Sequence, residues 1–298
     1  MIWSFSAYAS FRRCPRQWFY KRVYASSLAK DSARREAYRL SKLQGLLAWR
    51  GRIVDTVISE FIVPSISTNR PLTFDDAMRQ ADTFFAKERE QLVTAGAESG
   101  FFEIEYGKPL TEEMFAHALN DIHAALENFY AADSVWTLLA SAMRLVPQRT
   151  LSFGHAASTV QVRPDLIAFY PSLAPVVFDW KVNTRPLRDY WLQLVTGALA
   201  LTRCTPHRDW PLGGALYDAS DVQLLEVQLL VGDTRCHRAT AADVEDAEDF
   251  ISSSMAEMEF AYQCDVGDEP LPEDFPVAND PFVCQVCPFK KPCWGQTG

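Results

Sequence analysis

The chain has 298 residues, of which 48% are hydrophobic and 22% are charged, and its formal net charge is −9. This composition is typical of a globular protein and excludes disordered and fibrous classes. No apolar run approaches the roughly 20 residues of a membrane span, and the N-terminus lacks the pattern of a secretory signal. We therefore exclude membrane and secreted proteins and expect a cytoplasmic protein.

Charge is distributed unevenly along the chain. Residues 1–70 carry thirteen Lys and Arg against four Asp and Glu, whereas residues 233–280 carry two basic and fourteen acidic residues. A basic N-terminal segment can bind phosphate groups although the chain as a whole is acidic. Scattered surface charge would give the same counts, so this pattern alone leaves nucleic-acid binding open.

Three amphipathic helices are expected in the N-terminal part of the chain. Apolar residues recur every three to four positions over residues 41–61, over the segment that follows Thr73, and over residues 115–129. This spacing places the apolar side chains on one face of a helix. Thr73 has a side chain suited to an N-cap. We expect residues 1–142 to be largely helical.

Short strands are expected from Met143 onwards. Segments rich in β-branched and apolar residues, separated by Gly, Ser and Pro, are typical of strands joined by turns. Two later segments instead have helical spacing, and the second of them is acidic. The expected order is three strands (143–154, 158–170 and 174–183), a helix (187–202), two strands (213–218 and 222–230) and an acidic helix (240–263).

These elements predict an α/β fold in which helices pack against a central mixed sheet. We divide the chain into three parts of one continuous domain. They are a helical N-terminal part (1–142), a core of sheet and helix (143–232), and a C-terminal part with the acidic helix and a cysteine-rich tail (233–298).

Two acidic residues and a lysine lie on consecutive predicted strands. Asp165 lies within one strand, and Asp179 and Lys181 alternate to the same face of the next. Burial of these charges among apolar strands is costly, and the cost falls if the carboxylates bind a divalent cation. A lysine beside such a cation suits phosphodiester hydrolysis, where it orients water or balances charge on the phosphate. A structural ion pair at a sheet edge is the alternative.

Further polar residues could complete this site. Gln193 lies on the helix after Lys181, shares a helix face with Tyr190, and can reach back over the sheet towards a phosphate. Asp55 lies on an otherwise apolar helix and could supply a third carboxylate for the metal. Gln193 and Asp55 could equally be ordinary polar positions on helix surfaces.

The last fifteen residues contain three cysteines, Cys284, Cys287 and Cys293. In a cytoplasmic chain they are expected to be reduced thiols, and a CxxC turn lets two sulfurs approach one centre. Cys14 is the best candidate for a fourth ligand because it is also flanked by proline. Zn²⁺ and a [4Fe–4S] cluster both accept four thiolates, and the spacing does not decide between them. Either would join the two ends of the chain.

The segments that carry these residues resemble the PD-(D/E)XK nuclease superfamily. Within it they are similar to the RecB-like iron–sulfur nucleases, which include CRISPR-associated exonucleases and the nuclease domains of recombination helicase–nucleases. The segments cover nearly the whole chain in the order found in that family. They are SFSAYASFRRCPRQWFY, GRIVDTVISE, VRPDLIAFY, VVFDWKVN, DYWLQLVTGALAL and CQVCPFKKPC.

The resemblance implies a restriction-endonuclease-like core and a role for each residue above. It implies that Asp165 and Asp179 bind Mg²⁺ or Mn²⁺ and that Lys181 is the catalytic lysine. It implies that Gln193 and Tyr190 belong to the motif after the lysine. It also implies that the tail closes a [4Fe–4S] cluster, which favours iron over zinc, with the ligands Cys14, Cys284, Cys287 and Cys293.

One position departs from the family pattern. The family commonly has His where this chain has Asp55. Because Asp is also a hard ligand, we expect metal binding to persist there, with a metal preference that can differ.

We therefore predict a metal-dependent DNA nuclease, an exonuclease or single-strand nuclease, that acts in DNA repair, recombination or genome defence. Basic residues near the N-terminus would line the path of the strand, and these are Arg12, Arg13, Arg16, Lys21 and Arg22. The sequence contains no GxxxxGK[ST] loop, so unwinding would need a helicase or defence-complex partner.

Two other functions fit parts of the sequence. A catalytically inactive DNA-binding scaffold subunit would keep the fold and the cluster, but such a copy usually loses one of Asp165, Asp179 and Lys181. A zinc-stapled protein without a nucleic-acid role would be colourless when purified, whereas an iron–sulfur protein would be brown.

Overall fold

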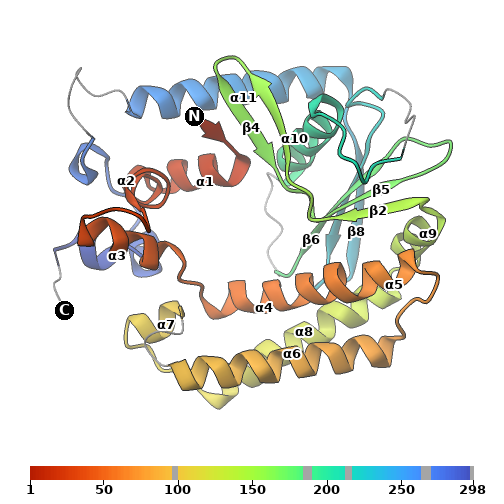
Figure 1. Cartoon of the computed structure of the whole chain (residues 1–298), viewed down its shortest axis with the longest axis horizontal. Coiled ribbons are helices and arrows are strands. Elements are labelled where there is room, and N and C mark those ends of the chain that lie inside the picture. The colour runs from red at the N-terminus through yellow and green to blue at the C-terminus, as the bar shows by residue number, and fades with distance from the viewer. Residues whose placement is uncertain (96–99, 184–189, 212–216, 263–269, 296–298) are drawn as a thin grey trace.

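A computed structural model describes residues 1–95, 100–183, 190–211, 217–262 and 270–295. A five-stranded sheet lies at its centre, with helices on both faces (Figure 1). Across these described ranges, no helix combines the length and apolar character needed to cross a membrane.

The central sheet contains, in spatial order, β2 (Arg144–Pro147), β5 (Leu166–Phe169), β6 (Val176–Lys181), β7 (Gln223–Gln228) and β8 (Asp233–Arg238). β6 and β7 are parallel, and the other neighbouring strands are antiparallel. The predicted α/β fold with a mixed sheet is therefore confirmed. β8 was not predicted, because its residues are mostly polar, which is typical of an exposed edge strand.

A smaller sheet contains, in spatial order, β1 (Ile2–Trp3), β4 (Ser158–Val162) and β3 (Leu151–His155). It forms because the segments 143–154 and 158–170, each predicted as one strand, divide between the two sheets. The first divides at Gln148, whose φ of 49° leaves the extended region. The second divides at Pro164, whose nitrogen cannot donate a ladder hydrogen bond. The prediction of one strand per segment is therefore wrong.

One face of the central sheet packs against helices of the N-terminal part (Figure 1). They are α4 (Leu46–Thr56), its π-helical continuation (Val57–Ile62), α5 (Val63–Ser67), α6 (Phe74–Ala95), α8 (Glu112–Ala131) and α9 (Asp133–Ser141). The predicted helices over 41–61, after Thr73 and over 115–129 correspond to α4, α6 and α8. Thr73 accepts a hydrogen bond from the Asp76 N–H and so caps α6, as predicted.

The other face is covered by α10 (Tyr190–Arg203) and α11 (Ala241–Tyr262), with α1 (Phe5–Arg13) beside them (Figure 1). α10 lies close to β6, because a Cβ on Gly197 would be 3.5 Å from the Val177 side chain. The helices predicted over 187–202 and 240–263 correspond to α10 and α11. Residues 187–189 and 263 lie outside the described residues, as does most of the strand predicted over 213–218.

The cysteine-rich tail packs against the N-terminal helices (Figure 1). The elements there are α2 (Pro15–Phe19), a π-helical turn (Tyr20–Tyr24), α3 (Ser32–Ser41), α7 (Phe102–Glu105), a 3-10 turn (Pro272–Asp274), α12 (Pro281–Gln285) and α13 (Lys290–Cys293). Phe19 stacks on Phe275 with ring centroids 4.3 Å apart, and Tyr20 stacks on Phe289 at 5.3 Å. These aromatic contacts bring residues from the two ends of the chain together.

Candidate active site and cysteine cavity

A buried aspartate and a lysine lie side by side on β6. Successive side chains of this strand alternate between the two faces of the sheet, so Phe178 and Trp180 pack towards α4 and α8. Asp179 and Lys181 take the opposite face, which α10 covers. Lys181 Nζ lies 2.6 Å from Asp179 Oδ2, and the Asp179 residue is only 6% exposed.

Gln193 on α10 reaches this pair from above the sheet. Its Nε2 donates a hydrogen bond to Asp179 Oδ1 at 3.0 Å. The two carboxylate oxygens of Asp179 therefore face different partners, Lys181 on its own strand and Gln193 on the covering helix. Tyr190 begins α10, and its side chain lies outside the described part of the chain.

Asp165 lies next to this group, at the start of the neighbouring strand. It directly precedes β5 and is not within a strand, which corrects the sequence-based placement. Because Leu166 pairs with Phe178, continuation of the antiparallel register places Asp165 opposite Asp179. Asp165 Oδ2 accepts a hydrogen bond from the Trp180 N–H at 2.7 Å, so its carboxylate is held against β6.

Asp55 on α4 faces the same region from the other side. It lines an open cleft together with Asp165, and the remaining lining residues are Gly51, Val54, Trp180 and Val182. The Gln148 side-chain amide donates to Asp55 Oδ2, and Arg163 in turn donates to the Gln148 side-chain oxygen. The structure thus brings Asp55 and Asp165 to one cleft.

Electrostatic coupling also links the three carboxyl groups. Burial, followed by the negative charges of Asp179 and Asp55, raises the pKa of Asp165 to about 8. Burial likewise raises the pKa of Asp179, although the Lys181 ammonium opposes the shift. The pKa of Asp55 is raised by burial as well, against the effect of its hydrogen bond from Gln148. A cation placed among these groups would relieve the cost of ionising them.

These carboxylates do not form a preassembled metal centre. Among the described residues, no three or more His, Cys, Asp or Glu side chains are arranged so that they could hold one ion. Each carboxylate instead pairs with a donor of the protein: Asp55 with Gln148, Asp165 with the Trp180 amide, and Asp179 with Lys181. Their oxygen donors are those that Mg²⁺ and Mn²⁺ prefer, but these protein contacts would have to be exchanged on binding.

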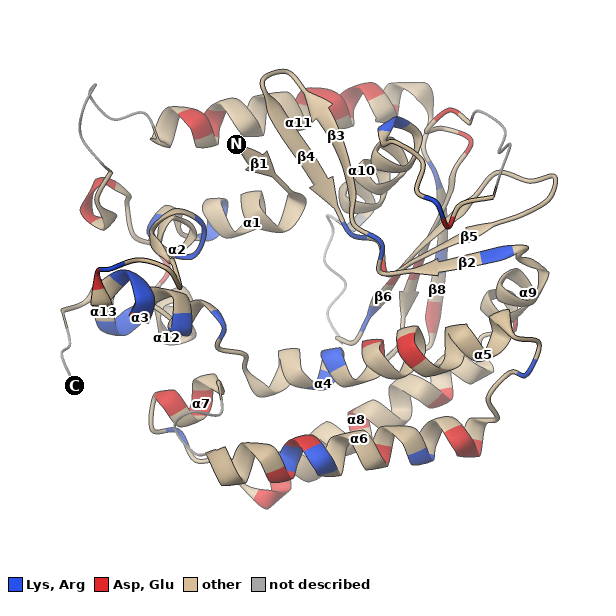
Figure 2. Cartoon of the chain, viewed as in Figure 1, with Lys and Arg blue, Asp and Glu red and all other residues tan. Residues whose placement is uncertain are grey.

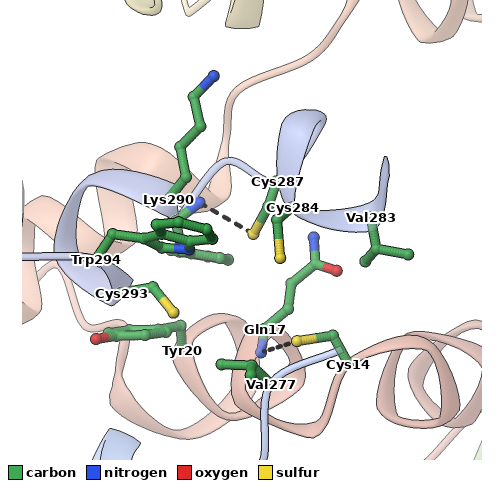
Figure 3. Close-up of a pocket in the computed structure, with 11 residues that line it drawn as sticks. Cys14, Gln17, Tyr20, Val277, Val283, Cys284, Cys287, Lys290, Cys293 and Trp294 are labelled. Atoms are coloured by element: carbon green, nitrogen blue, oxygen red, sulfur yellow. Dashed lines mark hydrogen bonds between the residues drawn. The ribbon is translucent and has the colours of Figure 1, made fainter. Parts of the chain in front are cut away.

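The four predicted ligand cysteines line one cavity between the two ends of the chain. Figure 3 shows that their sulfurs point into it, Cys14 from the start of α2 and the others from the tail. The Gln17 N–H donates to Cys14 Sγ and the Phe289 N–H to Cys287 Sγ, both at 3.4 Å. Hydrogen bonds of this kind are typical around sulfur ligands of metal clusters.

Two thiols of this cavity, Cys14 and Cys287, are buried, and the other two are partly exposed. Burial raises the pKa of Cys287 to about 12 and also raises that of Cys293, which Arg16 opposes. Such thiols stay protonated at neutral pH unless a metal displaces the proton. The four thiols line the cavity together, and both Zn²⁺ and a [4Fe–4S] cluster accept such a donor set.

A protein-family model matches residues 2–294, nearly the whole chain, and it describes the PD-(D/E)XK nuclease superfamily. The chain belongs to the PD-(D/E)XK nuclease superfamily. No curated protein matches the chain. Of the residues predicted from this family's motifs, Asp179 and Lys181 on β6 contact each other, Gln193 on α10 contacts Asp179, and Asp165 lies beside them just before β5.

Two solved structures are similar to this PD-(D/E)XK chain at low identity. One is the crystal structure of SSO0001, with 11% identity and a TM-score of 0.30, covering 66% of this chain and 80% of that one. The other is the crystal structure of a "Putative exonuclease" from Eubacterium rectale, with 9% identity and a TM-score of 0.33. It covers 83% of this chain and 97% of its own. Because both scores are low, we base no argument on these likenesses.

The basic residues that we predict to line the path of the DNA differ from one another in their contacts within the protein. Arg12 is ion-paired with Glu257 on α11 at 2.8 Å, and Arg13 donates to the Gln17 side chain. Arg16 donates to the Phe275 carbonyl at 2.8 Å and lies 3.9 Å from Cys293 Sγ, so it faces the cysteine cavity.

Lys21 and Arg22 lie on the exposed side of the π-helical turn after α2. Desolvation, followed by the positive charges of Arg22, Arg13 and Lys42, lowers the pKa of Lys21, which places these four cations near one another. Figure 2 shows Lys and Arg gathered on α2 and α3, whereas Asp and Glu lie along α11. This cationic cluster is the part of the prediction best placed to meet a phosphate backbone.

Sequence reasoning missed one buried acid beside the candidate active site of this PD-(D/E)XK protein. Glu226 on β7 pairs in register with Asp179, is 3% exposed, and its charge contributes to the raised pKa of Asp179. Gln228 donates to it at 2.5 Å, and Arg235 and His237 of β8 lie 3.9 and 3.8 Å away. The detectable signal was an acidic residue inside the apolar run VQLLEVQLL.

Proposed function

We propose that this PD-(D/E)XK protein is a metal-dependent DNA nuclease that hydrolyses phosphodiester bonds in single strands or at DNA ends. The observation that carries the proposal is the ion pair of Lys181 with Asp179, in register beside Asp165, which itself lines an open cleft. A buried cluster of acids with one lysine is expensive for stability alone, and it provides the groups that metal-assisted hydrolysis needs.

The chain's own residues have distinct roles in this proposal. Asp165 and Asp179, with Asp55 from α4, would hold Mg²⁺ or Mn²⁺, which supplies Lewis-acid activation of the phosphate and of water. Lys181 holds a positive charge beside Asp179 and would balance the charge that develops on the phosphate. Gln193 orients Asp179 through its amide. Tyr190 would contribute from the start of α10.

We propose further that the protein is of the RecB-like iron–sulfur type. The four thiols that line one cavity support this proposal, because a [4Fe–4S] cluster accepts four thiolates and the family resemblance favours iron over zinc. The cluster would close the tail onto the N-terminal helices. It would also hold the cationic cluster of Arg13, Lys21, Arg22 and Lys42 in place for a DNA strand.

Cleavage of end-labelled single-stranded DNA by the purified protein tests the proposal. We expect cleavage with Mg²⁺ or Mn²⁺ and none with EDTA, with a labelled RNA of the same sequence as a parallel substrate. DNA binding without cleavage under any of these conditions would instead identify the alternative, an inactive scaffold subunit. Stimulation by an added helicase would test the proposed partner in repair or defence.

Metal binding is expected to strengthen as the pH rises. Because burial holds the pKa of Asp165 at about 8, above the ordinary 3.8, the metal-free folded protein binds more protons than the unfolded chain between these values. The stability contributed by this group is thus present at low pH and lost towards about pH 8. A cation must displace the proton, so its affinity should rise by up to about tenfold per pH unit below that value.

Isothermal titration of the protein with Mn²⁺ at several pH values measures this dependence. Asp165→Asn should bind Mn²⁺ weakly and with little change over the same pH range. An affinity of the wild-type protein that is constant between about pH 6 and 8 would contradict the raised pKa of Asp165.

A further inference from the structure

Arg50 on α4 is a buried arginine whose side chain is 9% exposed. Arginine is rarely buried unless its guanidinium is paired, and here it has two partners on different elements. It forms an ion pair with Asp121 on α8, and its Nη2 donates to the main-chain carbonyl of Val182 at 2.8 Å. Arg50 therefore ties two helices to the chain at the end of β6.

Arg50 and its partner Val182 both adjoin residues of the candidate active site. Val182 directly follows Lys181, and Gly51 directly follows Arg50. Gly51 and Val182 line the cleft that contains Asp55 and Asp165, and a Cβ on Gly51 would lie only 3.9 Å from Val182 Cβ. The hydrogen bond from Arg50 to Val182 thus joins α4, which carries Asp55, to the end of β6, which carries Lys181.

We propose that Arg50 is a positioning residue that sets the separation between α4 and the end of β6, and so between Asp55 and Lys181. This inference rests on the proposed nuclease function. It does not require Arg50 to contact the substrate, because Arg50 acts through the Val182 carbonyl. A guanidinium suits this role because its fork holds a carboxylate and a carbonyl at once, which an ammonium cannot do in the same geometry. A displacement of about 1 Å in such a site costs about 100-fold in rate.

Arg52 provides a matched control on the same helix. Its guanidinium also forms an ion pair across to another helix, since it donates to Glu88 on α6. Within the described part of the chain its side chain bonds to Gln44 and Glu88 and not to β6, and it is 41% exposed. Substitution of Arg52 therefore removes a comparable interhelical ion pair without touching the strand end.

The experiment compares Arg50→Met, Arg50→Lys and Arg52→Met in the full-length protein, with metal-dependent cleavage of single-stranded DNA. We expect Arg50→Met to lower kcat by about 100-fold while KM changes by less than about threefold. Arg50→Lys should recover part of this loss, and Arg52→Met should stay within about twofold of the wild-type protein. Equal kcat values in Arg50→Met and Arg52→Met would overturn the proposal.

Hydrogen–deuterium exchange supplies a readout that does not need catalysis. The Leu229 N–H donates to the Lys181 carbonyl at 2.8 Å, so exchange at Leu229 reports the order of the strand end. In Arg50→Met we expect faster exchange there and in 181–183, with β5 unchanged. If Arg50→Met does not fold, the same comparison is made with Arg50→Lys.

The two measurements separate the inference from the function on which it rests. A wild-type protein without metal-dependent cleavage would refute the nuclease function, and the exchange result alone would then decide whether Arg50 holds the strand end. Active wild-type protein with unchanged exchange and unchanged kcat in Arg50→Met would refute only the positioning role.

Discussion

Replacement of Asp179 by Ala is expected to lower DNA cleavage by about 1000-fold or more, because it removes a proposed metal ligand that would be worth several kcal/mol to the transition state. The same change leaves the Lys181 ammonium without its partner 2.6 Å away and Gln193 without its acceptor. Single-turnover cleavage of labelled DNA with Mg²⁺ measures the effect, and circular dichroism checks that the variant is folded.

Lys181→Met should have an effect of similar size for a different reason. It keeps the length of the side chain but removes the positive charge beside the scissile phosphate, so kcat should fall with little change in Mn²⁺ affinity. Lys87→Met, a charge-removing change at an exposed position on α6, is the matched control and should retain activity. Substantial cleavage by either Asp179→Ala or Lys181→Met would refute the proposed active site.

Cys14→Ser is expected to destabilise the protein strongly. Because Cys14 and Cys293 lie near opposite ends of the sequence, a cluster that holds both closes a very long loop, worth about 5 kcal/mol by chain entropy. The melting temperature should fall by at least about 10 °C. The variant should also lose the brown colour expected from the proposed cluster, which visible absorbance records together with iron and sulfide content.

Cys236→Ser is the control for this experiment. Cys236 is an exposed thiol on β8, outside the cysteine cavity, and its replacement should change neither the colour nor the melting temperature. A wild-type preparation that contains zinc and no iron would contradict the cluster. Equal melting temperatures for Cys14→Ser and Cys236→Ser would contradict the proposal that the cluster joins the two ends of the chain.

Part of the active site could be predicted because the relevant interactions are local. The alternation of side chains along one strand is enough to place Asp179 and Lys181 on one face, and the structure shows them in contact. The helix that follows brings Gln193 back over the same face, and its amide reaches Asp179. These relations depend on residues within about one strand and one helix of each other.

Other features depended on contacts between distant residues. Sequence reading placed Asp165 within a strand, because it could not show that Pro164 divides one apolar segment between two sheets. Arg16 was assigned to DNA, whereas its guanidinium lies beside Cys293 near the other end of the chain. Both arrangements depend on contacts with residues that are remote in sequence.

The amino-acid sequence by itself determined the family, the alternation of β6 and the helices with one apolar face, because these depend on residue type and short-range periodicity. Only the tertiary structure decided that Asp55 shares a cleft with Asp165, and that Arg50 joins α4 to Val182. Both relations depend on how α4 packs against the sheet. That packing is set by many side chains acting together, and no local pattern contains it.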